Sequence, residues 1–485
     1  MESNVVILKK DNKGFNRINR IRRVLSFLLG ISGFLIILFC LPDAFSYPAK
    51  VMIATVFFGV TLWALEPIPL GLTALIVLLI MLLFGVADTS VIFSGFASPA
   101  IYLIVGGMML AKAVNETSLA KRITYMILKK RGNTSKGLLG SILAIMHIQA
   151  FFIPATAVRT TLMLPISTMI IKTVDAKPRS NLRKMILLGV AYGGNISGTA
   201  VMTAAVGNIL TIEILNSYAN ISITYFQWFY YTFPLWLMLI PSMWLLLLKL
   251  FPLPKDERFF PMIKKEMEVK INELGPVNIR ELKCLAVLIL IVSLWITEPL
   301  HGLHPSVPAI IGVVLMTLPG TGCAKWENVV NINYNTVLLV SITLSMGYTL
   351  IASGASNTIG EYLSTGWIKN ILQTPTFAVI FIVVLTQVFH KMISNVSTAV
   401  VTLIPIVLSM ASNTNIDPLI VGFTAGISSL FGFVLVVETM PNLLVHSTGM
   451  IEQKDYLKPG FYATIVTTVL TIIVALTWWR VIGLL

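Results

Sequence analysis

A short polar stretch with a proline and an arginine, residues 153–161 (IPATAVRTT), interrupts a strongly apolar part of the chain. An arginine inside such a run is costly in a bilayer, so it usually faces a cavity and carries function. Its planar, permanently charged guanidinium suits carboxylates, and the free N–H groups at a helix start also attract anions. We therefore expect this stretch to bind a small anion. The candidate substrate-binding residues here are Pro154, Ala155, Thr156, Ala157, Arg159 and Thr160.

A second polar break, residues 394–398 (SNVST), stands in the other half of the chain. Landmarks in the two halves recur at one offset, because Pro165 and Pro405, like Gly107 and Gly347, lie 240 residues apart. We interpret this as an internal duplication whose two breaks meet at one site for an anion with two carboxylates. For the hydroxyl side chains, ordinary packing between membrane helices is the alternative. The candidates on this side are Ser394, Asn395, Val396, Ser397 and Thr398.

Two further apolar runs, residues 186–216 and 417–447, contain glycine, asparagine or proline residues that should unwind a helix. Unwound backbone at membrane depth is tolerated only where it is buried in protein or lines a cavity. These runs therefore belong beside the two breaks. They add Gly194, Asn195, Pro441 and Asn442 to the substrate-binding candidates.

Three ionisable residues, Arg159, His390 and Glu438, are candidates for coupling or for balancing charge. Glu438 could relay a proton, ligate a cation or pair with a basic group, and we expect pairing first. The alternative for Arg159 is a buried ion pair, with Glu438 as the candidate partner. The alternative for His390, which precedes the second break, is that of an ordinary packed side chain.

The composition places these residues in an all-α polytopic membrane protein. Of the 485 residues 56% are hydrophobic and 12% are charged, whereas soluble domains carry about 25% charged residues. The apolar blocks match the roughly 20 residues of a spanning helix, and a barrel would need short alternating segments. The net charge of +14 gathers in short loops, so we expect a lipid bilayer and no nucleic acid as partner.

Several classes of site lack a signature in this sequence. The three cysteines have no C-x-x-C spacing, so we expect no metal site, and we expect no cofactor. Motifs of the types HExxH, GxSxG and GxxxxGK[ST] are missing, which leaves an enzyme or an ATP-driven pump without support.

The distribution of basic residues predicts the topology. Residues 1–23 form a basic, cytoplasmic N-terminal tail of a multi-pass protein in the cell membrane. The first half, 24–250, contains a re-entrant helical hairpin at 137–172, because both of its flanks are basic, with its tip at 154–159. A polar cytoplasmic loop, 251–283, leads to an inverted second half, 284–485, with a hairpin at 376–412. About eleven transmembrane helices plus two hairpins result, and such inverted repeats with broken helices are a plan of secondary transporters.

The chain resembles the divalent anion:sodium symporter family, whose members include the INDY-type dicarboxylate transporters. The resemblance covers nearly the whole chain and is carried by Gly106-Gly107-Met108-Met109-Leu110-Ala111, by the Leu-Pro-Ile or Ile-Pro-Ile after each break, and by Pro441-Asn442. It implies a homodimer that moves its transport domains like an elevator, with a Ser-Asn-Thr motif at both tips that binds carboxylates and frames sodium sites. The sequence departs from this motif at both tips, and Arg159 stands close to a sodium position. It is similar there to the Pro-Ser-Asn-Thr-Ala-Arg string of the citrate/succinate antiporters and plastid 2-oxoglutarate/malate translocators.

These features favour a sodium-independent antiporter that exchanges C4/C5 dicarboxylates such as succinate, malate, fumarate and 2-oxoglutarate. The guanidinium would neutralise the substrate in place of sodium, and the empty site would keep a charge that is costly to move. The alternative is a sodium- or proton-coupled di- or tricarboxylate symporter in which Glu438 restores a cation site. An anion channel or a sensor is a distant alternative.

Overall fold

The computed structural model describes residues 12–132, 134–174, 177, 180–253, 259–363, 370–393, 395–412, 414 and 416–485, and the regular structure in these residues is helical throughout. The first half contains α1 (Asn12–Cys40), α2 (Tyr47–Leu65), α3 (Leu70–Leu83), α4 (Thr89–Ala97), α5 (Pro99–Glu116), α6 (Leu119–Arg131), α7 (Ser135–Ala150), α8 (Thr156–Thr173), α9 (Asn181–Ser197), η1 (Met202–Ala204), α10 (Val206–Ala219) and α11 (Tyr225–Leu250). The remainder contains α12 (Phe259–Leu274), α13 (Ile279–Ile296), α14 (Glu298–His301), α15 (Ser306–Thr317), α16 (Trp326–Val329), α17 (Tyr334–Ala352), α18 (Ala355–Leu363), α20 (Pro375–His390), α21 (Val396–Ser412), α22 (Pro418–Ser428), η2 (Val436–Glu438), α23 (Met440–His446), α24 (Gln453–Val474) and η3 (Ala475–Trp479).

Many of these helices are apolar enough for a bilayer, as a polytopic membrane protein requires. Six helical stretches within the described residues are also long enough to cross one: Arg23–Cys40, Tyr47–Leu65, Thr89–Glu116, Tyr225–Leu250, Tyr334–Ala352 and Gln453–Trp479. Five apolar helices are shorter, and they include members of the hairpins and broken runs discussed below. The total of eleven spans stays a prediction.

Each expected hairpin is a pair of helices separated by a short irregular segment. In the first pair, α7 and α8 are separated by residues 151–155, and in the second, α20 and α21 are separated by residues 391–395. We call these segments tip one and tip two. Both tips lie a few residues before the expected ones, 154–159 and 394–398, because the residues after Ala155 and after Asn395 are already helical. Ser394, a candidate binding residue, lies outside the described residues.

The two apolar runs with helix-breaking residues are broken in the same way. One runs from α9 through η1 to α10, and the other runs from α22 through η2 to α23. The 3₁₀ turns η1 and η2 start 234 residues apart, and so do α10 and α23. Equal spacing of equal elements is what a duplication would produce, although the duplication itself stays a prediction.

One asparagine closes each of these breaks with the same hydrogen bonds. Asn208 Nδ2 donates to the carbonyls of Gly198 at 2.7 Å and Val201 at 3.0 Å. Asn442, 234 residues later, donates from Nδ2 to the equivalent carbonyls of residues 432 and 435, both at 3.1 Å. The two asparagine side chains are fully buried. They satisfy carbonyls that a broken helix would otherwise leave without a donor in an apolar interior.

The segment expected to be a polar loop, 251–283, is largely helical instead. Its α12 buries Phe260, Ile263 and Met267, which are spaced to share one face, and packs against α6. The guanidinium of Arg122 on α6 forms a bidentate pair with Glu281 at the start of α13, with N–O distances of 2.6 and 2.9 Å. The apolar spacing and this pair fix the connection between the two halves.

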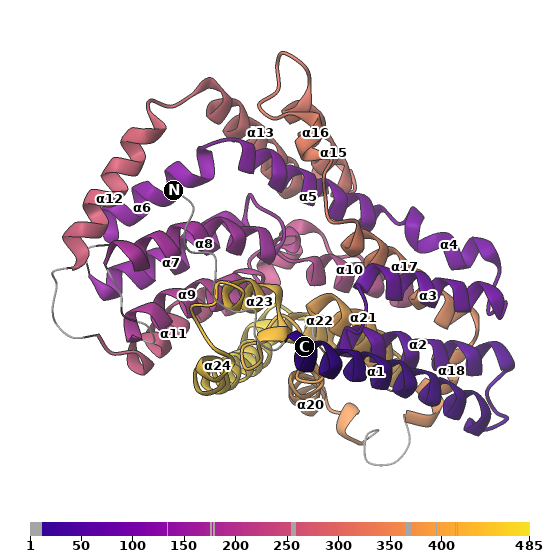
Figure 1. Ribbon diagram of the computed structural model, residues 1–485. Helices are drawn as coiled ribbons and strands as arrows, with labels where there is room; N and C mark the ends of the chain where they lie inside the picture. Colours follow the sequence, from indigo (N-terminus) through magenta and orange to yellow (C-terminus); the bar gives the residue numbers. More distant parts are fainter. Residues whose placement is uncertain are drawn as a thin grey trace.

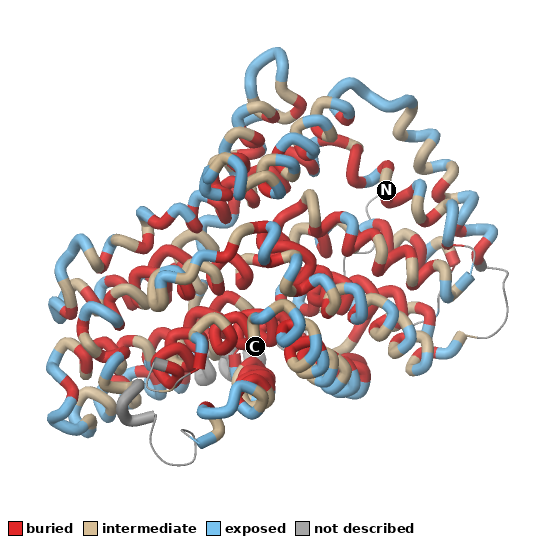
Figure 2. Tube along the Cα trace, turned by 180° about the vertical axis from the view of Figure 1, so that it is seen from behind, coloured by how far each residue is buried: buried red, intermediate tan, exposed pale blue. Residues whose placement is uncertain are grey.

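The helices gather into two apolar cores. Figure 1 shows α1, α2, α3, α4, α17 and α18 together at one end of the molecule and α6, α7, α8, α9, α11 and α12 at the other, with α5 running between them. The smaller core is formed mainly by side chains of α1 to α4 and α17, and the larger by the hairpins and the broken helices together with α5, α6, α11, α12, α13, α15 and α24. Buried positions concentrate in the middle of the molecule, where the broken helices lie (Figure 2).

The hydrogen bonds of Asn208 in the first broken helix lead to a prediction about the stability of the protein. Substituting Asn208→Ala leaves the carbonyls of Gly198 and Val201 without their donor, at a cost of about 1–3 kcal/mol for each group. We expect a clearly lower melting temperature in detergent, followed by intrinsic tryptophan fluorescence. The control Asn272→Ala removes an exposed side chain from α12 and should leave the melting temperature nearly unchanged. Equal melting temperatures for the two variants would contradict this role of Asn208.

Candidate functional site

A cavity of about 410 Å³ lies between the two tips and the helices opposite them, within the size range of small-molecule sites. Tip one with the first turn of α8, and tip two with the first turn of α21, form one side of it. Residues of α5 and the start of α17 form the other. Its described lining consists of Met108, Ala111, Lys112, Asn115, Ala155, Thr156, Ala157, Val158, Thr161, Asn195, Ala205, Val206, Gly207, Ile332, Asn333, Thr336, Asn395, Val396, Ser397, Leu430, Met440 and Leu444.

Tip one presents the uncapped start of a helix to this cavity. Its last residue, Ala155, has φ 69° and makes no side-chain capping bond to α8. The first N–H groups of a helix have no partner within that helix. Thr156, Ala157 and Val158, which carry such groups, all line the cavity. The partial positive charge of this helix end therefore faces the space where a ligand would lie.

Tip two contributes an amide and a hydroxyl side chain. Asn395 Oδ1 accepts a hydrogen bond from the backbone N–H of Ser397 at 2.9 Å, which orders the start of α21. Both residues and Val396 line the cavity. Thr398, one residue further on, is fully buried and lies away from the cavity, and its hydroxyl has no partner among the described residues.

Arg159 was expected to face the cavity, but its side chain is buried behind tip one. Its Nη1 donates to the carbonyls of Ile153 at 2.8 Å and Ala204 at 2.9 Å, and its Nη2 donates to Ser197 Oγ at 3.0 Å. The expected alternative, an ion pair with Glu438, is not formed either. The guanidinium instead joins tip one to the broken helix α9–η1–α10, because three oxygens of these segments converge on it. Its charge still lies within one turn of the cavity-lining start of α8.

The candidates from the broken helices meet at a helix crossing beside the cavity. A side chain at Gly194 would come within 3.0 Å of Thr160 Oγ1 and Pro441 Cβ, so this position needs a glycine. Asn195 donates from Nδ2 to the carbonyl of residue 432 at 2.8 Å and to Asn442 Oδ1 at 3.2 Å. Of these residues only Asn195 lines the cavity, and the others hold the crossing together.

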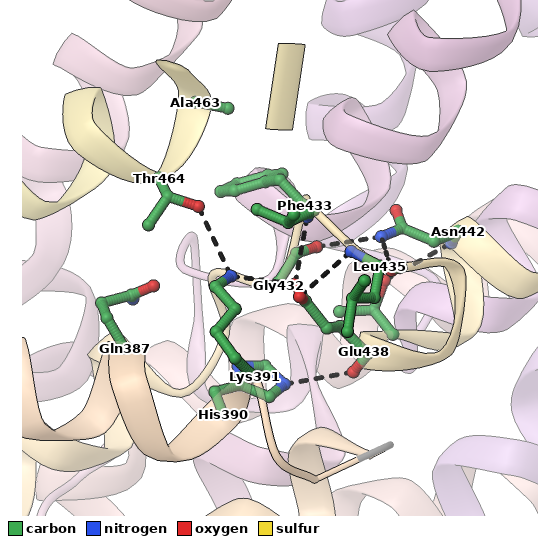
Figure 3. A network of polar contacts seen from close by, with 12 residues as sticks. Gln387, His390, Lys391, Gly432, Phe433, Leu435, Glu438, Asn442, Ala463 and Thr464 are labelled. Atoms are coloured by element: carbon green, nitrogen blue, oxygen red, sulfur yellow. Dashed lines mark hydrogen bonds and ion pairs between the residues drawn. The ribbon is translucent and has the colours of Figure 1, made fainter. Parts of the chain in front are cut away.

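Glu438 is paired, as expected first, and its partner is Lys391. Lys391 Nζ lies 3.0 Å from Glu438 Oε2 and 3.5 Å from Thr464 Oγ1 (Figure 3). The carboxylate also accepts bonds from two backbone N–H groups of its own loop. His390 Nε2 lies 3.1 Å from the carbonyl oxygen of Glu438. These side chains join α20 to the loop before α23 and to α24, and they are not part of the cavity lining.

The cavity thus gathers seven of the expected binding residues: Ala155, Thr156, Ala157, Asn195, Asn395, Val396 and Ser397. Pro154 lines only a small neighbouring cavity and packs against Gly107 of α5. Three further lining residues, Lys112, Asn115 and Asn333, were not among the candidates expected from the sequence. The sequence context of Lys112 could have indicated a role in the site, because a lysine within the apolar run of α5 costs free energy in a bilayer as Arg159 does.

The positive φ of Ala155 in tip one leads to a second prediction about stability. A positive φ with extended ψ costs an L-residue such as Ala155 about 1–3 kcal/mol. Glycine adopts this conformation without that strain, so Ala155→Gly should keep or raise the melting temperature in detergent. The matched control Ala157→Gly lies two residues further on, inside α8. It should lower the free energy of unfolding by about 1 kcal/mol, and with it the melting temperature. Equal losses in both variants would contradict the strained conformation of Ala155.

Comparisons with known proteins agree with this architecture. The family model described as the sodium:sulfate symporter transmembrane region matches residues 22–485. A protein of Staphylococcus saprophyticus named sodium-dependent dicarboxylate transporter is 25% identical over 491 residues, covering 96% of this chain and 92% of the relative. An uncharacterised transporter of Haemophilus influenzae is 26% identical, with 93% and 96% covered. A protein of Cupriavidus necator named only as a membrane protein is 22% identical, with 91% and 89% covered. The match across almost the whole chain shows that it belongs to the sodium:sulfate symporter family, the divalent anion:sodium symporters expected from its motifs.

Proposed function

We propose that the protein is a secondary transporter of C4/C5 dicarboxylates. The observation that carries this proposal is the cavity between the two tips, which receives the uncapped start of α8 from one hairpin and Asn395 with Ser397 from the other. Two such walls suit an anion with a carboxylate at each end. The relatives named as sodium-dependent dicarboxylate transporters support the same substrate class.

For the coupling, sodium symport is the stronger proposal. The exchange hypothesis required a guanidinium in contact with the substrate, and Arg159 is directed away from the cavity toward three oxygen acceptors. The printed names of the Staphylococcus relatives support sodium dependence. Glu438 is not the cation ligand that we propose, because its carboxylate is already held by Lys391.

One observation favours sodium-independent exchange as a second candidate. The Arg159 guanidinium is fully buried, lies one turn from the cavity-lining start of α8, and forms no ion pair with a described carboxylate. A fixed positive charge beside tip one would attract a dianion without any bound cation. In this case the substrate-loaded site would move between the two sides of the membrane more readily than the empty site. Each dicarboxylate that enters would then be exchanged for one that leaves.

The remaining parts of the transport cycle follow from the same proposal. The hairpins and broken helices would move together as a carrier against the remaining helices, exposing the cavity to alternate sides in an elevator-type cycle. The N-terminus would be cytoplasmic in the cell membrane, and a homodimer would provide the fixed frame.

Uptake of labelled succinate into proteoliposomes tests the function and its coupling. Half of the vesicles are preloaded with unlabelled succinate, and each set is assayed with an inward sodium gradient and with potassium instead. We expect sodium to drive uptake into vesicles that contain no dicarboxylate. Uptake that requires internal succinate and ignores sodium would establish exchange and contradict symport. Lack of uptake in every set would overturn the dicarboxylate class, with sulfate and citrate as the next substrates.

A variant of Arg159 also distinguishes sodium symport from exchange. Under symport, Arg159→Ala should reduce sodium-driven uptake at least about tenfold, because buried carbonyls lose their donors and tip one loses its anchor. Under exchange, removing the fixed charge lets the empty binding site return across the membrane without a counter-substrate. Succinate should then be taken up into vesicles that contain no dicarboxylate. Arg131→Ala, at the exposed end of α6, serves as the control and should match the wild type.

A further inference from the structure

Lys112 is the only charged side chain that lines the cavity among the residues the structure describes. It lies on α5, the helix that packs chiefly against α15 and that lines the cavity together with the two tips. Asn115 on the next turn of α5 and Asn333 at the start of α17 lie on the same wall. This wall therefore presents a positive charge and two amides to the ligand space.

Lys112 has no oppositely charged partner among the residues that the structure describes. Its ammonium forms no ion pair or hydrogen bond with any described side chain or carbonyl. The nearest carboxylate in sequence is Glu116, one turn further along α5, at the spacing at which opposite charges often pair on a helix. Glu116 instead accepts hydrogen bonds from the backbone N–H of Lys325, at 2.8 Å, and from the Asn328 amide. The Lys112 ammonium is left to face the cavity.

The same cavity is lined by a second electropositive group, the uncapped start of α8 at Thr156 and Ala157. A helix start attracts one carboxylate, and an ammonium in the same cavity attracts a second. A monoanion needs only one of these groups, and a dianion can engage both. The neutral amides of Asn115 and Asn333 can donate to the carboxylate that Lys112 attracts.

We propose that Lys112 is a specificity-determining residue that binds the second carboxylate of the substrate and so selects dianions over monoanions. This inference rests on the proposed transport of dicarboxylates. It assigns the discrimination between one and two carboxylates to a residue outside the two tips. Arg159, buried behind tip one, adds to the positive potential of the site but does not line the cavity.

Competition binding to the purified full-length protein in detergent tests this assignment. Unlabelled succinate and its monomethyl ester, which lacks one charge, compete with labelled succinate on the wild type and on Lys112→Met. We expect Lys112→Met to weaken succinate binding by up to about fivefold, the scale of one exposed charge pair, and to change binding of the monoester little. Lys112→Arg keeps the charge and should retain the preference for succinate. Lys121→Met changes an exposed lysine of α6 outside the cavity and should match the wild type.

The outcomes separate this inference from the function on which it rests. A wild type that binds succinate tightly, together with Lys112→Met that keeps the same ratio of succinate to monoester affinity, would overturn the role of Lys112 alone. Equal weakening of both ligands would also overturn it, because it would mark a structural effect. A wild type that binds neither compound would overturn the dicarboxylate proposal itself. The melting temperature of each variant identifies any that fails to fold.

Discussion

The backbone groups that are left unpaired where membrane helices break constrain the rest of this structure. In an apolar surrounding each such group needs a partner inside the protein. Asn208 and Asn442 supply donors to the two breaks, and Arg159 supplies donors to tip one and to η1. Because these partners satisfy the carbonyls, the first N–H groups of α8 can remain open toward the cavity. The stability of the breaks and the chemistry of the site thus depend on the same few buried side chains.

The two halves of the chain place different charged side chains beside their broken helices. In the first half the guanidinium of Arg159 reaches the carbonyl of Ala204, the last residue of η1. In the second half the equivalent residue, 234 positions later, is Glu438, whose carbonyl contacts His390 and whose carboxylate pairs with Lys391. The first half therefore holds a cation without a carboxylate, and the second holds a compensated pair. This asymmetry leaves a net positive charge beside tip one, where an anion can benefit from it.

Sequence patterns predicted the breaks in the helices, because prolines and glycines act locally, and the basic flanks of residues 137–172 predicted the first hairpin. The directions of long side chains could not be predicted in this way. Arg159 was placed near the correct tip, but whether its guanidinium points into the cavity or back to Ile153 depends on which carbonyls the fold brings within reach. Lys112 was missed because its apolar run was interpreted as a plain span, although a lysine inside an apolar run indicates a water-filled cavity as an arginine does. The helix α12 was missed because its charged residues outweighed the spacing of Phe260, Ile263 and Met267.

Under the proposed function, the cavity between the two hairpin tips binds a dicarboxylate together with a cation. The most direct measurement is the affinity of the purified protein for succinate by isothermal titration calorimetry, in sodium chloride and in potassium chloride at equal ionic strength. Sodium symport predicts that binding is markedly tighter in sodium and that the affinity rises with sodium concentration. Equal affinity in the two salts would contradict sodium coupling and would favour a site whose positive charge is supplied by the protein alone.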